Sequence, residues 1–257
     1  MAYRVETDLL GEMKVPCDAY YGIHTIRAAG NFPVSGMKVH PALIKAVAQV
    51  KQAAALANMG AGLLERKTGE AIAAGAAEVA DGGLADQFIV DAFQGGAGTS
   101  INMNANEVIA NRAIEFMGGN KGDYRLVHPL AHVNLSQSTN DVFPTALRVA
   151  AISMVLELSE TLAGLQAVLQ AVLQDKEAAF AGILKLGRTE MQDALPVTLG
   201  QEFSAYAEAV ARDRWRLYKV EERLRQVNLG GTAVGTHIWD MSRQQSWLSG
   251  PGRKRDG

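Results

Sequence analysis

The sequence is short of the features that mark secreted, membrane-associated or nucleic-acid-binding proteins. Its 257 residues include one cysteine, Cys17, so no disulfide can form within the chain, and this suits a reducing compartment. The formal net charge is only −2, which favours neither nucleic acid nor a membrane surface as a partner. Arg4 and Glu6 carry charge where a signal peptide would need an apolar run, so we expect a cytoplasmic protein.

The chain also lacks a recognisable arrangement of metal ligands. Paired histidines at a fixed short spacing are the usual signature of a zinc site. No second pair of ligands that would complete a zinc site accompanies the five histidines, which are His24, His40, His128, His132 and His237. We therefore expect no metal and no other cofactor.

Strand signals are scarce, whereas alanine is abundant in long periodic segments, and this predicts a mainly α-helical protein. Glycine and proline interrupt residues 1–40, which we interpret as an irregular lead-in. A polar connection is expected over residues 187–198. Helices are expected over residues 41–59, 67–79, from the end of a glycine-rich loop to about 117, 142–174 and 198–227.

The predicted helix over residues 142–174 is apolar on nearly every side. Between Arg148 and Asp175 its only charges are Glu157 and Glu160, and these glutamates argue against a membrane span. A helix of this kind should be enclosed by other helices, of which one short chain supplies few. Partner subunits are therefore the expected source of the cover.

The start of that helix is preceded by a run of small polar side chains. Ser138, Thr139 and Asn140 place neutral hydrogen-bond donors at a helix N-terminus, where free backbone N–H groups and the helix dipole favour an anion. Ordinary helix capping would explain one such residue equally well. The contiguous set favours an anion site.

A glycine-rich loop over residues 94–100 offers a second helix start with uncharged donors, Thr99 and Ser100. No Gly-Lys-Ser/Thr follows, and the spacing after Gly98 does not complete a dinucleotide fingerprint, so a nucleotide site is not expected. A plain loop and cap would explain the glycines. It would not explain the density of threonine, serine and asparagine.

These polar stretches, in this order, resemble the N-terminal part of the fumarase/aspartase superfamily, most nearly its aspartate ammonia-lyases. The resemblance covers about residues 3–236, although fumarases usually carry a serine where this chain has Ala97. The matching motifs lie at residues 8–11, 18–28, 86–88, 94–100, 102–111, 137–141, 187–189, 192–193 and 200–203.

The resemblance implies a fold and an activity. The expected fold is an N-terminal helical domain over residues 1–140 followed by a partial central helical bundle over residues 141–236. The implied reaction is the reversible elimination of ammonia from L-aspartate to give fumarate, in a homotetramer whose active sites draw on three subunits. A fumarate hydratase of class II is the runner-up.

The resemblance also implies roles for the residues of this chain that match the family's site positions. Thr99, Ser138 and Thr139 would hold the carboxylate that takes up charge, while Asn140 and Thr189 would bind elsewhere on the substrate, including near its amino group. At the position of Glu190 the family usually has histidine or glutamine. The carboxylate of Glu190 could pair with the substrate's ammonium. Residues 130–132 lack the family's asparagine and aspartate, so a secondary dicarboxylate site is not expected, and His128 and His132 are interpreted as structural or exposed.

The superfamily's signature loop, Gly-Ser-Ser-x-x-Pro-x-Lys-x-Asn-Pro, carries the serine that takes the proton, and it does not occur among these residues. No residue is therefore assigned as catalytic, and activity is expected to be impaired. Residues 237–257 are interpreted as an unrelated tail, the sign of a truncated or frame-shifted gene product. A non-catalytic subunit is the remaining alternative.

Overall fold

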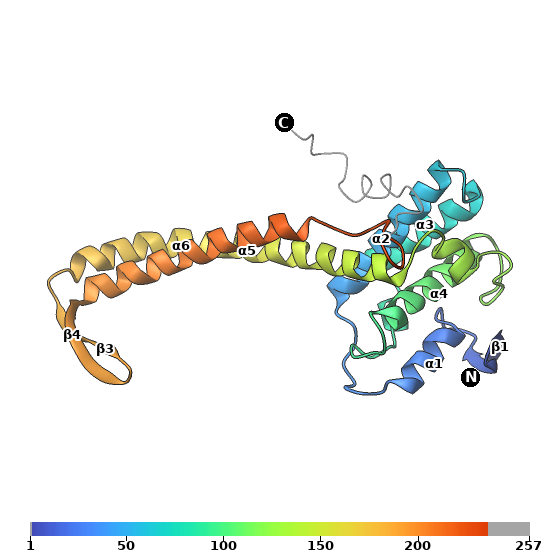
Figure 1. The fold of residues 1–257 in the computed structure, drawn as a ribbon, viewed down its shortest axis with the longest axis horizontal. Helices are drawn as coiled ribbons and strands as arrows, with labels where there is room; N and C mark the ends of the chain where they lie inside the picture. The colour runs from blue at the N-terminus through green and yellow to red at the C-terminus, as the bar shows by residue number, and fades with distance from the viewer. Residues whose placement is uncertain (1, 236–257) are drawn as a thin grey trace. The chain divides into compact units, whose positions relative to one another are not determined.

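The computed structural model describes residues 2–235, in two compact units. We call residues 1–150 together with 227–257 the N-terminal unit, and residues 151–226 the helical-arm unit. Figure 1 shows both units and labels most of their helices and strands. The tail expected from residue 237 lies outside the described residues.

The first forty residues are more regular than the sequence predicts. Strands β1 (Tyr3–Asp8) and β2 (Gly11–Pro16) form an antiparallel hairpin, and α1 (Ile23–Asn31) follows. Arg4 ties these pieces together by donating to the backbone carbonyls of Pro16, Ala19 and Tyr21, each at 2.8 Å. The prediction of an irregular lead-in was wrong because β1 and β2 pair with each other across the turn at residues 9–10, although glycine and proline interrupt the segment.

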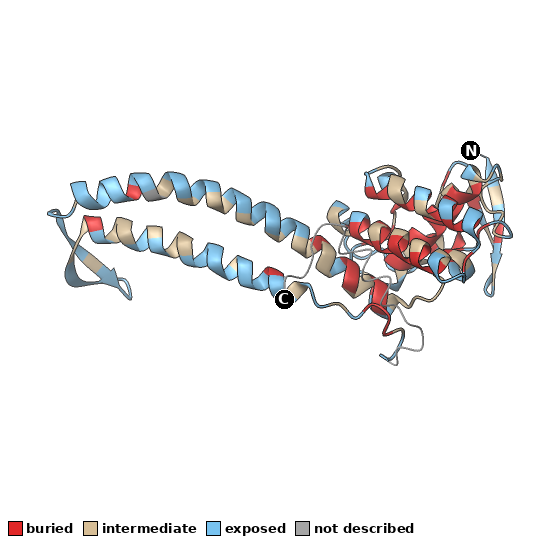
Figure 2. Ribbon diagram, turned by 90° about the horizontal axis from the view of Figure 1, so that it is seen from above, coloured by how far each residue is buried: buried red, intermediate tan, exposed pale blue. Residues whose placement is uncertain are grey.

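Three helices form the core of the N-terminal unit, and they are α2 (Pro41–Gly60), α3 (Arg66–Ala80) and α4 (Thr99–Phe116). Their buried residues are mostly alanine, valine and isoleucine, drawn in red in Figure 2. Small residues let the helices approach closely: a Cβ at Gly75 of α3 would lie 3.3 Å from the carbonyl oxygen of Ile109 in α4. The mainly α-helical prediction is confirmed. The short helical turns η1 (Ala85–Gln87) and η2 (Pro129–Val133) connect these elements.

Helix α5 (Thr139–Ala179) begins in the N-terminal unit and continues into the helical-arm unit. It extends three residues before and five residues beyond the predicted range of 142–174. Pro144 lies inside its first turns and has no N–H to donate to the carbonyl of Asn140. The side chain of Asn228 donates to that carbonyl instead, at 2.6 Å, so the helix starts early without an orphaned acceptor.

In the helical-arm unit, α5 and α6 (Leu199–Leu224) are joined by a hairpin of β3 (Leu184–Thr189) and β4 (Gln192–Thr198). The sequence predicts only a polar connection here, so the prediction missed the strands. Glu190 and Met191 form the two-residue turn with φ of +53° and +62°. Asparagine, aspartate or glycine usually occupies such positions, so these two residue types do not predict the turn. Thr198 and Gln201 then form a capping box that starts α6.

Apolar side chains recur at three- and four-residue steps along α5, and we call them the seam of α5: Leu158, Leu162, Leu165, Leu169 and Val172. Leu158, Leu165 and Val172 are each 46–48% exposed. By length and composition α5 could cross a membrane, with a mean hydropathy of 1.5 over an 18-residue window that is 22% buried. Glu157 and Glu160 argue against a span, and core helices of bundles pass the same test.

Candidate functional site

The loop before α4 ends on a glycine in the left-handed region. Gly98 has φ +88°, and a Cβ there would lie 2.2 Å from the ring of Phe143, so no other residue fits without movement. Gln94 of the same loop accepts a hydrogen bond from the backbone N–H of Ile101 at 2.9 Å. Thr99 is the first residue of the helix and is exposed. The helix start therefore presents the exposed side chain of Thr99, next to a buried glycine that the ring of Phe143 covers.

The start of α5 is capped reciprocally. The hydroxyl oxygen of Ser138 accepts from the backbone N–H of Asn140 at 3.2 Å, and the backbone N–H of Ser138 donates to Asp141 Oδ2 at 3.1 Å. Capping, one of the two interpretations drawn from the sequence, is thus present. It occupies the oxygen of Ser138 as an acceptor and leaves its proton free to donate.

The starts of α4 and α5 touch each other. Asn102, in the first turn of α4, donates from Nδ2 to the hydroxyl oxygen of Thr139 at 3.0 Å. Gly98 packs under the ring of Phe143 at the same junction. Two helix N-termini with hydroxyl side chains therefore meet within the N-terminal unit, and helix N-termini favour an anion.

The hydroxyls of Ser138 and Thr139 are poised as donors. Each accepts a hydrogen bond from the protein, and neither donates one to any residue that the structure describes. A hydroxyl that already accepts has its proton left for a ligand, and a carboxylate oxygen is an acceptor only. The two hydroxyls are therefore suited to donate hydrogen bonds to a carboxylate.

Asn140 is more constrained than the sequence predicts. Its side-chain Nδ2 donates to the carbonyl of Ala233 at 3.0 Å, while Asn228 binds its own carbonyl. The segment 228–235 thus lies over the first turn of α5. One N–H of the Asn140 amide remains for a ligand.

A buried polar network under these helix starts was missed in the sequence. Lys51 of α2 is fully buried and donates from Nζ to Asn134 Oδ1 at 2.7 Å and to Gln137 Oε1 at 2.9 Å. Burial lowers the pKa of Lys51 well below its ordinary value. The available signal was a lysine placed between Val50 and the alanines at positions 53–55, a position where charge is rarely kept without a reason.

Thr189 and Glu190, the other predicted site residues, belong to the helical-arm unit. Thr189 ends β3 and pairs with Gln192, and Glu190 occupies the hairpin turn with positive φ. Both are exposed. Their convergence with Thr99, Ser138 and Thr139 stays a prediction.

The two histidines near η2 have structural contacts. His128 accepts the backbone N–H groups of Leu130 and Ala131 through Nδ1, at 3.1 and 3.2 Å, and so caps the turn. Burial lowers the pKa of His128, which keeps the ring neutral and able to accept. His132 Nδ1 in turn accepts the N–H of His128 at 2.9 Å. Among residues 2–235 there is no cluster of three or more acidic, histidine or cysteine side chains able to hold a metal.

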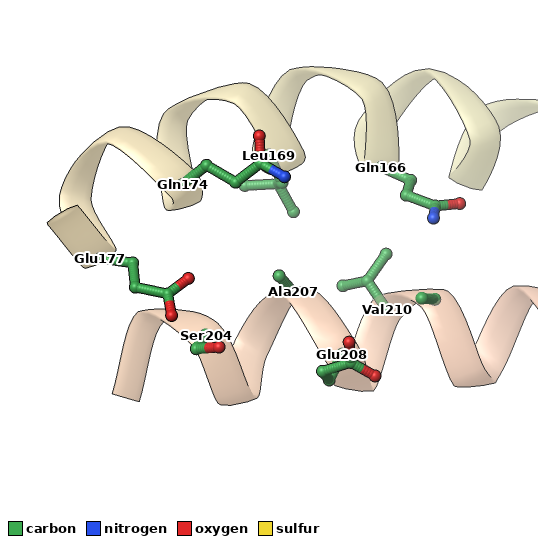
Figure 3. Close-up of a pocket in the computed structure, with 9 residues that line it drawn as sticks. Gln166, Leu169, Gln174, Glu177, Ser204, Ala207, Glu208 and Val210 are labelled. Carbon is green, nitrogen blue, oxygen red and sulfur yellow. The ribbon is translucent and has the colours of Figure 1, made fainter. Parts of the chain in front are cut away.

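A separate cavity of about 130 Å³ lies between the distal parts of α5 and α6 (Figure 3). Leu169, Ala207 and Val210 point into it, with Gln166, Glu177 and Glu208 around them. None of the predicted site residues lines it. Its mixed lining fits a packing gap between two half-exposed helices better than a binding site.

Comparison with known proteins gives a consistent result. A lyase family model matches residues 11–245. An aspartate ammonia-lyase from Bacillus sp is 54% identical over 235 residues, and one from Bacillus subtilis is 51% identical over 236 residues. These alignments cover 91% and 92% of this chain but 49% of each relative, so the chain spans about half the length of the curated relatives it matches.

Fumarases and related solved structures match as well. A class II fumarate hydratase from Halobacterium salinarum is 52% identical over 236 residues, which are 92% of this chain and 49% of that protein. The crystal structure of a fumarate lyase:delta crystallin from Brucella melitensis matches with a TM-score of 0.85 at 48% identity, covering 96% of this chain and 53% of that one. A class II fumarase from Schistosoma mansoni matches with a TM-score of 0.84 at 34% identity, over 96% of this chain and 52% of that one.

Proposed function

Because this chain belongs to the lyase family, we propose that it binds L-aspartate and fumarate, the substrate and product of a reversible elimination of ammonia. The observation that carries the proposal is the junction of two helix N-termini, where the hydroxyls of Ser138 and Thr139 are left as donors. The aspartate ammonia-lyases at 51–54% identity support the choice of substrate.

The chemistry explains why such donors matter. Removing the proton next to the side-chain carboxylate of L-aspartate concentrates two negative charges on that carboxylate. Preorganised donors that meet the developing charge contribute about 2.7–4 kcal/mol each when they act like oxyanion-hole donors. We assign this work to Thr99, Ser138 and Thr139.

The remaining part of the substrate falls to other residues. Asn140 keeps one amide N–H for it, and Thr189 and Glu190 would reach it from a neighbouring copy of the chain. The carboxylate of Glu190 can pair with the substrate's ammonium. No residue is assigned the role of base, because the sequence has no match to the signature serine loop.

Fumarate hydration is the second candidate. The Halobacterium salinarum relative at 52% identity is named a class II fumarate hydratase. Both reactions involve fumarate and require hydrogen bonds to its carboxylate. The hydroxyls of Ser138 and Thr139 could donate these bonds in either reaction. The difference lies in what binds the leaving group.

Three measurements on the purified chain separate the candidates. The ultraviolet absorbance of fumarate follows its formation from L-aspartate and its loss by hydration, and calorimetry measures fumarate binding against acetate as the monocarboxylate control. Activity with L-aspartate alone supports the lyase, and hydration alone supports the hydratase. Fumarate binding without either activity, with the helical circular dichroism retained, supports a non-catalytic subunit. A chain that does not bind fumarate contradicts the proposal.

We also propose that copies of the chain associate through the seam of α5, as a homotetramer. The side chains of Leu158, Leu165 and Val172 are each about half exposed, and this supports association, because burying apolar side chains is favourable. Light scattering on the purified chain tests this. A monomeric mass at micromolar concentration would contradict it. The cytoplasmic location stays a prediction.

A further inference from the structure

Lys51 has an unusual environment for a charged side chain. It is the largest fully buried side chain of the described residues, and its two hydrogen-bond partners, Asn134 and Gln137, are neutral amides. Burying an ammonium is costly unless it is well bonded, and neutral partners repay less of that cost than a carboxylate would. A lysine kept under these conditions needs an explanation beyond packing.

The ammonium fixes the direction of its partners' amides. Lys51 Nζ donates to Asn134 Oδ1 and Gln137 Oε1, so the side-chain oxygens of both amides face it. The oxygen of Asn134 also accepts from the Nδ2 atoms of Asn102, at 3.2 Å, and Asn106, at 3.3 Å. The nitrogen of Asn102 is thereby directed toward this cluster rather than its oxygen.

The same nitrogen reaches the candidate site. Asn102 Nδ2 also donates to Thr139 Oγ1 at 3.0 Å. Because the hydroxyl oxygen of Thr139 accepts on the protein side, its proton is left to point at a ligand. A continuous path therefore runs from Lys51 through Asn134 and Asn102 to the donor end of Thr139.

We propose that Lys51 is a positioning residue that sets Thr139 as a hydrogen-bond donor toward a bound carboxylate, acting through Asn134 and Asn102. This inference rests on the proposed function, because it assumes that a carboxylate binds at Thr139. Lys51 itself touches no substrate in this arrangement. It fixes the direction of each hydrogen bond in the network. That direction determines whether Thr139 presents a donor or an acceptor to the ligand.

The test compares Lys51→Met with Asn58→Leu. Asn58 is a matched control because it is also buried in α2 and also bonds the segment after η2, donating to the carbonyl of Leu135 at 3.0 Å, but it lies off the path to Thr139. Both variants are expected to lose stability. Fumarate affinity measured by calorimetry should fall at least about tenfold in Lys51→Met and less than about twofold in Asn58→Leu.

A double-mutant cycle separates positioning from general loosening. In a Thr139→Val background the donor is already gone, so Lys51→Met should cause no further loss of fumarate affinity. An additive loss would overturn the proposal. So would equal fumarate affinities for Lys51→Met and the unaltered chain.

A second readout needs no ligand. Hydrogen exchange of the backbone amides over residues 139–142 and 102–106 should accelerate in Lys51→Met and not in Asn58→Leu. If the unaltered chain binds no fumarate, the proposed function fails, and exchange alone decides whether Lys51 orders these helix starts. Unchanged exchange would then reject the role of Lys51.

Asn102→Ala provides a second route if Lys51→Met does not fold, because it cuts the same path one step later. Its matched control is Asn104→Ala, a fully buried asparagine of the same helix whose amide donates to the carbonyl of Gln87 at 3.0 Å. Fumarate affinity should fall about tenfold in the first variant only. Equal affinities in the two variants would overturn the path.

Discussion

The side-chain nitrogen of Asn102 lies 3.0 Å from the hydroxyl oxygen of Thr139, and this one hydrogen bond joins the first turns of α4 and α5. The two residues are 37 positions apart in the chain. Their contact joins the two helix starts at which we propose that a carboxylate binds.

Thr139→Val should weaken fumarate binding about 10–100-fold, because it removes a donor to a charged group. It also leaves one N–H of Asn102 without its acceptor, so the free energy of unfolding should fall by about 1–2 kcal/mol. Calorimetric titration and urea denaturation measure the two effects. An unchanged fumarate affinity would remove Thr139 from the proposed site.

Thr145→Val is the matched substitution in the same helix, and it should have the opposite sign for stability. The hydroxyl of Thr145 is fully buried and has no hydrogen-bond partner among the described residues. Replacing it with a methyl group removes an uncompensated polar atom, so the free energy of unfolding should stay equal or rise by up to about 1 kcal/mol. A clear loss of stability would show that this hydroxyl is bonded, for example by a buried water.

Gly98→Ala should destabilise the junction by about 1–3 kcal/mol, because the new methyl group would meet the ring of Phe143 and φ is +88°. Gly11→Ala is the control, since Gly11 has φ +106° with open space around it. The control should lose only about 1–2 kcal/mol of the free energy of unfolding, from the strain of a non-glycine residue at positive φ. Thermal unfolding compares them. Equal losses would show that the ring moves aside freely.

Asp91 should make stability depend on acid. Its carboxylate accepts from the hydroxyl of Ser35 at 2.7 Å and from the backbone N–H groups of Ser35, Gly36 and Phe93 at 2.7–2.8 Å. The Ser35 hydroxyl bond, with these N–H groups, holds the pKa of Asp91 well below its ordinary value.

A pKa lowered by folding contributes stability that is fully present above the pKa of the unfolded chain and is lost as pH falls toward the folded value. Asp91→Asn should therefore be less stable than the unaltered chain at pH 7, and the difference should shrink below about pH 4. Denaturation at a series of pH values measures it. Asp123→Asn, which breaks an exposed pair with Arg125, should show little effect at any pH. A pH-independent difference at Asp91 would refute the assignment.

The sequence by itself determined the mainly α-helical class, the positions of most helices and the polar character of the helix starts at Thr99 and Thr139. Those properties follow from local periodicity and from capping residues, which act within a few positions of the chain. Tertiary structure alone decided the placement of α1, because Glu107, which accepts the N–H of Gly22 at 2.8 Å just before this helix, lies far along the chain. It also decided that Lys51 lies beneath the junction of α4 and α5, since a single buried ammonium acquires meaning only from the amides that surround it.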